Sequence, residues 1–79
     1  MASELESAQA EAGELADAIR AAAGRLTARQ RAVFWGLLGG EPPEALGLRL
    51  GLTVNAIYQT MFQARRRLRA ELSAQGFLE

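Results

Sequence analysis

Residues 43–72 read PEALGLRLGLTVNAIYQTMFQARRRLRAEL, and this stretch decides the fold. It predicts a short helix from about Pro43 to Leu50, because proline is tolerated in the first turn of a helix and Gly51 can end it. Thr53 is a suitable N-cap for a longer helix. The apolar residues of that longer helix recur at spacings of four, three, four and four, as one buried face requires: Ile57, Met61, Ala64, Leu68 and Leu72. A short helix, a turn of about three residues and a longer helix make a helix-turn-helix unit.

The sequence before this unit predicts another helix that packs beside it. Thr27 and Gln30 fit a capping box, in which each side chain satisfies the backbone N–H of the other residue. An apolar stripe follows and stops at Gly39 and Gly40, because glycine enters the left-handed cap conformation without strain. The members of this stripe are Val33, Phe34, Leu37 and Leu38. We expect all four to face the core.

Residues 1–26 are rich in Ala and Glu and carry a seven-residue apolar repeat. Its members are Leu5, Ala8, Ala12, Leu15, Ile19, Ala22 and Leu26. We expect residues 2–12 to be a frayed lead-in and residues 13–23 to be a firmer helix that packs on the core; a dimerising coiled coil is the alternative. The chain is therefore predicted to be an all-α, four-helix domain without a β-wing. Its expected parts are an acidic lead-in or linker over 1–13, the helix-turn-helix domain over 14–73 and a short tail over 74–79.

The composition excludes several classes of function. A chain of 79 residues forms one small domain that buries only about 60% of its unfolded surface. It has no Cys and no His, which excludes disulfides, zinc fingers, thiol chemistry and imidazole catalysis. No catalytic arrangement or glycine-rich phosphate loop is recognisable, so we expect no enzyme, no cofactor and no metal site. We also expect a cytoplasmic chain without a membrane span, because the apolar runs are short and the start is acidic.

The net charge of zero hides a difference between two parts of the chain. Residues 1–24 carry five acidic residues and one Arg, a net charge of −4. Residues 25–79 carry eight Arg and four Glu, a net charge of +4. Such a division suggests an anionic partner for the basic part.

Three blocks of the sequence resemble region 4 of bacterial sigma factors. LTARQRAVF at 26–34 is similar to the family's Leu-x-x-Arg-Gln-Arg-x-Val-Phe opening, and LGLTV at 50–54 is similar to its Leu-Gly-Ile-Ser-Val turn. ARRRL at 64–68 is similar to its Ala-Arg-Arg-Arg-Leu ending. The resemblance covers residues 15–72 and is nearest to the extracytoplasmic-function group. It implies a transcription-initiation module whose last helix recognises the −35 promoter element, with double-stranded promoter DNA and RNA polymerase as partners and an anti-sigma factor as a further candidate.

The chain also departs from the family pattern. The family usually begins the third helix with Glu-Ile-Ala, whereas this chain has Ala45, Leu46 and Gly47. We expect Gly47 to cost about 1 kcal/mol relative to the usual Ala, because glycine is unfavourable inside a helix. The Arg that commonly precedes the Ala-Arg pair is Gln63 in this chain, so the part of the last helix that would read bases is poor in charge.

The outward face of the last helix holds the candidate DNA-reading residues. In a helix-turn-helix docked in the major groove, amide side chains can pair with adenine and aromatic surface can contact a thymine methyl group. These candidates are Thr53, Asn55, Tyr58, Gln59, Phe62, Gln63 and Arg66. Candidates for phosphate contacts, which position a protein without specifying sequence, are Arg29, Arg31, Arg49, Arg65, Arg67 and Arg69. The alternative for the arginine run is a solvated helix C-terminus stabilised by the helix dipole.

Tyr58 and Phe62 lie four residues apart on a face that is expected to meet water or DNA. Three interpretations stay open: packing against a neighbouring loop or against Phe77 and Leu78, contact with DNA, and contact with a protein. The third defines an alternative function, in which a degenerate helix-turn-helix binds an anti-sigma factor, polymerase or another copy of itself.

Overall fold

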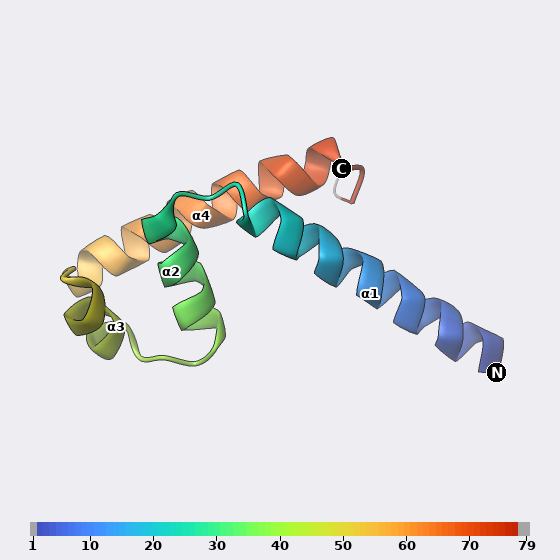
Figure 1. Cartoon of the computed structure of the whole chain (residues 1–79), viewed down its shortest axis with the longest axis horizontal. Helices are drawn as coiled ribbons and strands as arrows, with labels where there is room; N and C mark the ends of the chain where they lie inside the picture. Colours follow the sequence, from blue (N-terminus) through green and yellow to red (C-terminus); the bar gives the residue numbers. More distant parts are fainter. Residues whose placement is uncertain (1, 78–79) are drawn as a thin grey trace.

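The structure is a computed structural model that describes residues 2–77, with side chains from residue 13 onward. Its elements are α1 (Ala2–Ala23), α2 (Ala28–Leu38), α3 (Pro43–Leu50) and α4 (Val54–Ala74) (Figure 1). Residues 2–77 contain no strand. The prediction of an all-α domain of four helices is therefore confirmed.

The long helix α4 is the centre of the domain. It packs against each of the other three helices, and α2 also packs against α3. Figure 1 shows α3 beside the start of α4 and α2 beside its middle, whereas α1 approaches the second half with its C-terminal end only. The N-terminal half of α1 extends away from the other helices, which makes the molecule 48 Å long and only 25 Å by 17 Å across.

The helix starts follow the predicted capping chemistry. The Thr27 hydroxyl accepts a hydrogen bond from the backbone N–H of Gln30 at 3.1 Å, and the Gln30 side-chain oxygen accepts one from the backbone N–H of Thr27 at 3.1 Å. At the start of α4, the Thr53 hydroxyl accepts from the backbone N–H of Ala56 at 3.0 Å. Both predicted N-caps are confirmed, and each satisfies a backbone N–H that has no partner within its helix.

The turn between α3 and α4 depends on two glycines for different reasons. Gly51 ends α3 in the left-handed conformation with φ of 72°, which an L-residue with a side chain adopts only with strain. Gly47 lies where the chain passes closest, because a Cβ atom there would be 2.5 Å from the backbone oxygen of Leu52. We therefore expect Gly to be more favourable than Ala at position 47, in contrast to the expectation from helix propensity. The helix accepts a less favourable residue so that the turn can pack against it.

The core consists of two clusters on either side of Met61, which contacts both. The first joins α1 and α2 to the second half of α4 through Ala22, Ala23, Leu26, Phe34, Ala64 and Leu68. The second joins α2 and α3 to the first half of α4 through Val33, Leu46 and Ile57. Every residue predicted to face inward from α4 is buried or half-buried. Thr60 is buried as well, which the apolar pattern did not indicate.

The stripe predicted for α2 is correct at three of its four positions. Val33 and Phe34 are buried, and the half-buried Leu37 packs on the second cluster. Leu38 is 61% exposed instead, because it is the last residue of α2 and the chain turns away at Gly39.

The helix α1 is continuous from Ala2 to Ala23 and includes Gly13. Of its apolar repeat, Ala22 is buried and Ile19 packs on the first cluster, whereas Leu15 is exposed. The earlier members at positions 5, 8 and 12 lie outside the residues whose side chains are described. The boundary after residue 13 and the alternative coiled coil stay predictions. In the described part of the chain, no helix has the length and apolar character needed to cross a membrane.

Candidate nucleic-acid interface

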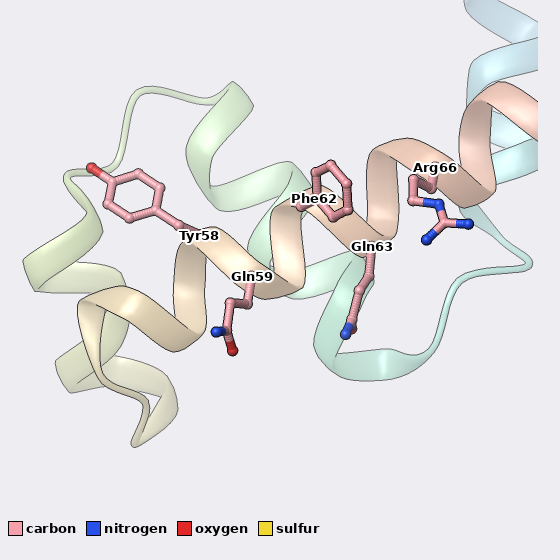
Figure 2. A pocket seen from close by; sticks show the side chains of 5 residues that line it. All are labelled: Tyr58, Gln59, Phe62, Gln63 and Arg66. Atoms are coloured by element: carbon pink, nitrogen blue, oxygen red, sulfur yellow. The ribbon is translucent and has the colours of Figure 1, made fainter.

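The outward face of α4 forms a shallow groove with a volume of about 390 Å³. Figure 2 shows its five lining residues along the same helix: Tyr58, Gln59, Phe62, Gln63 and Arg66. All five were among the predicted DNA-reading residues. They lie opposite the buried face of α4, because a helix that buries one stripe must present the intervening positions outward.

The aromatic pair is largely exposed. Tyr58 is 57% exposed and Phe62 is 62% exposed, so neither is covered by a loop or by the part of the tail that the structure describes. This exposure speaks against the interpretation that the pair packs locally. Leu78, the other tail residue of that interpretation, lies outside the described residues.

Arg66 is placed above one of these rings. Its guanidinium carbon lies 6.0 Å from the centre of the Phe62 ring, within the range of a cation–π interaction. The positive charge is thereby held at one end of the groove and stays exposed to solvent.

A second groove, of about 300 Å³, lies between the start of α2 and the middle of α4. Its lining residues are Gln30, Gln63, Arg66 and Arg67. Since Gln63 and Arg66 line both grooves, the two form one polar and aromatic surface. Gln30 was predicted only as a capping residue. Its place at the start of the helix beside α4 could have indicated that it also lines this groove.

Thr53 and Asn55 complete the predicted base-reading set at the start of α4. Both are exposed. The Thr53 hydroxyl already accepts the capping hydrogen bond, which holds it at the helix N-terminus. Asn55 has no hydrogen-bond partner among the described residues, so its amide is available to a ligand.

The predicted phosphate-contacting arginines divide into two groups. Arg29, Arg65 and Arg69 are exposed, and none of them forms an ion pair with a residue in the range 13–77. Arg67 lies 3.8 Å from Glu71, which also accepts a hydrogen bond from Arg25 at 3.0 Å. The first three are therefore the arginines most available for phosphate.

Arg31 is engaged with the backbone of the preceding turn. Its guanidinium donates to the carbonyl oxygens of Ala23, Gly24 and Leu26 at 3.4, 3.5 and 3.1 Å. These carbonyls come at and just after the C-terminus of α1, where backbone acceptors have no intrahelical partner. Arg31 thus ties α2 to the end of α1, a role that the sequence did not reveal.

Arg49 forms a two-point ion pair with Glu41. Its Nε and Nη2 atoms donate to the two carboxylate oxygens at 3.0 and 2.9 Å. The Arg49 hydrogen bond lowers the pKa of Glu41, and the same contact raises the pKa of Arg49. The pair ties the loop before α3 to the end of α3, so Arg49 would have to exchange Glu41 for a phosphate.

Acidic side chains do not gather into a possible metal site within the described residues. What the face presents instead is amide, aromatic and guanidinium groups, which suit recognition of a surface rather than chemical change.

Comparison with known proteins identifies the family. The sequence matches the family described as Sigma-70, region 4, over residues 16–68, from the second half of α1 to Leu68 in α4. No curated protein and no solved structure gave a match. The matched range contains both core clusters, the capping box and all the residues that line the two grooves. The chain therefore belongs to the sigma-70 region 4 family of DNA-binding helix-turn-helix domains.

Proposed function

We propose that this domain recognises a −35 promoter element through the outward face of α4 and contacts RNA polymerase during transcription initiation. The family assignment makes it a DNA-binding, sigma-factor-like module. The observation that carries the finer proposal is the exposed groove on the second helix of the helix-turn-helix, lined by groups that can contact base edges. This role would place the chain in the cytoplasm.

In this proposal, exposed arginines near the groove supply the phosphate contacts. Arg29 at the start of α2, with Arg65 and Arg69 on α4, would contact the DNA backbone and fix the register of the helix. Arg31 and Arg49 act mainly within the fold, because their guanidinium groups already have protein partners. Three phosphate contacts on a chain with zero net charge give weak binding to free DNA. Attachment to polymerase would compensate by raising the local concentration of the promoter.

A salt titration of duplex binding tests this proposal. Labelled promoter duplexes are titrated with the full chain, and log Kobs is plotted against log salt. With three phosphate contacts the slope should be about −3. Arg69→Gln should weaken binding to all duplexes alike and reduce the slope by about 1. Arg20→Gln is the matched control, since Arg20 pairs with Asp17 on α1 and should not affect binding.

The outcomes separate the roles of individual residues. Loss of affinity for some sequences only in Arg66→Ala would assign Arg66 to a base, and uniform loss would assign it to a phosphate. Absence of binding to any duplex at low salt, with polymerase present or absent, would contradict the proposal.

The alternative function is protein interaction through the same helix. The observation that favours it is the pair of exposed rings at Tyr58 and Phe62, because adjacent exposed aromatic side chains are common anchors of protein interfaces. The partner would be polymerase, an anti-sigma factor or a second copy of the chain. Such a partner should co-purify with the tagged chain and should be lost when the same experiment is done with Phe62→Ala.

A further inference from the structure

The outward face of α4 carries two parallel rows of side chains with different chemistry. The amide row consists of Asn55, Gln59 and Gln63, and the aromatic row consists of Tyr58 and Phe62. Members of one row are four residues apart, so they lie one above another along the helix. In Figure 2, Gln59 and Gln63 project to one side of α4, while Tyr58 and Phe62 project to the other.

We propose that these two rows select A·T-rich DNA in the major groove. The inference rests on the proposed DNA-binding function and names the class of sequence that it reads. Adenine presents its N7 acceptor and N6 donor in the major groove, which one amide side chain can satisfy with two hydrogen bonds. The thymine paired with it presents a methyl group, which favours apolar contact. An A·T pair therefore offers side by side the two kinds of contact that the rows make.

The same face has few of the groups that read G·C pairs. Guanine is read by Arg or Lys, and cytosine is read by an acidic side chain that accepts from its amino group. Arg66 is the one cation among the five residues lining the groove, and none of the five is acidic. Arg66 also lies at the C-terminal end of the groove, above Phe62. The face accommodates one guanine at most.

The spacing within each row fits about every second base pair. Neighbours in a row are about 6 Å apart along the helix, from a rise of 1.5 Å per residue. Base pairs are stacked about 3.4 Å apart, so each amide would meet about every second pair. Asn55 to Gln63 then spans a core of about four base pairs.

The amides are free to make these contacts. None of the three has a hydrogen-bond partner within residues 13–77, and all three are exposed. The aromatic rings are likewise uncovered. DNA binding would therefore break no internal hydrogen bond on this face.

Selection from a random duplex library, followed by base analogues, tests the inference. The full chain should enrich duplexes with an A·T-rich core at low salt. In the best duplex, 7-deazaadenine removes N7 and should weaken binding about 5- to 150-fold at a position read by an amide. Uracil in place of thymine removes one methyl group and should weaken binding about fourfold per contact.

Matched variants assign each effect to its row. Gln59→Ala should lose sensitivity to 7-deazaadenine at one position and retain sensitivity to uracil, and Phe62→Ala should show the reverse. Gln59→Arg should change the preferred base at one position from adenine to guanine. The thermal unfolding of all three should match that of the parent, because the replaced side chains are exposed.

The experiment distinguishes failure of the inferred A·T selectivity from failure of the proposed DNA binding. Selection of G·C-rich duplexes, or binding that is indifferent to both analogues, would overturn the inference while leaving DNA binding in place. Absence of binding to any duplex at low salt would overturn the proposed function and this inference together.

Discussion

Both sides of the helix-turn-helix unit carry large apolar residues, but the two sides differ in how far these residues are buried. On the inner side, Leu46 and Ile57 are fully buried. On the outer side, Leu48 is 88% exposed and Phe62 is 62% exposed. Position around each helix, rather than residue type, decides which side holds the fold and which side meets a partner. The comparison implies that changes on the inner side affect unfolding and that changes on the outer side affect binding.

The largest expected effect tests the inner side. Leu68→Ala should lower the free energy of unfolding by about 2–5 kcal/mol, because it leaves a cavity in the cluster that joins α1 and α2 to α4. Chemical denaturation monitored by circular dichroism at 222 nm measures the change. Leu48→Ala is the control on the outer side and should change stability by less than about 0.5 kcal/mol. Equal losses in the two variants would contradict the comparison.

A smaller effect concerns the close approach behind the turn. Gly47→Ala should destabilise the domain by about 1–3 kcal/mol, since the added methyl group would meet the Leu52 carbonyl and force the turn to move. Gly13→Ala is the matched control, because it lies inside α1 with open space around it and should stabilise the helix by up to about 1 kcal/mol. Thermal unfolding should therefore shift in opposite directions. A Gly47→Ala variant that is more stable than the parent would restore the expectation drawn from helix propensity.

On the outer side, the double variant Tyr58→Ala/Phe62→Ala separates three explanations of the aromatic pair. We expect stability to change by less than about 1 kcal/mol and DNA binding to weaken by about 1–3 kcal/mol. Unfolding and duplex titration are measured on the same preparation, together with retention of any co-purifying protein. Full DNA affinity with loss of a bound protein would favour the alternative function, and a large loss of stability would favour local packing.

The comparison also shows which features the sequence could predict. The bounds of α2 and α3, the start of α4, the two side-chain N-caps and the inward residues of α4 depend on spacing and on local hydrogen bonds, and these were predicted correctly. The exposure of Leu38 depends on where the chain leaves the helix, and the need for Gly47 depends on a contact with Leu52 across a turn. Neither is encoded in a periodic pattern.

The same limit applies to the candidate interface. The residues of the outward face of α4 could be predicted together, because the apolar stripe that faces the core determines which positions face outward. Arg31 and Arg49 could not be distinguished from the remaining arginines, because their partners lie in the turn after α1 and in the loop before α3. A run of charges in a sequence does not tell which charges are already paired.

The smallest expected effect concerns the ion pair between Glu41 and Arg49. Because Arg49 lowers the pKa of Glu41 in the folded chain below its usual value of 4.5, the charged pair stabilises the fold above the pKa of the unfolded Glu. That stabilisation is lost as the pH falls through the lower, folded pKa. Glu41→Gln should therefore lower the melting temperature slightly at neutral pH and have no effect in acid. Glu14→Gln on α1 is the control and should have no effect at either pH, since Glu14 forms no ion pair among residues 13–77.

DNA binding by Arg49→Gln and Glu41→Gln shows whether Arg49 also contacts a phosphate when DNA is bound. If Arg49 acts only within the fold, Arg49→Gln should leave the salt dependence of duplex binding unchanged, in contrast to Arg69→Gln. If Arg49 exchanges Glu41 for a phosphate, Arg49→Gln should reduce the slope by about 1, and Glu41→Gln should strengthen binding by releasing the guanidinium. We expect the first result, because the two-point contact holds the guanidinium against the loop at 2.9 and 3.0 Å. A reduced slope in Arg49→Gln would return this residue to the phosphate-contacting group, and the outer side of α3 would then belong to the interface as well as the outer side of α4.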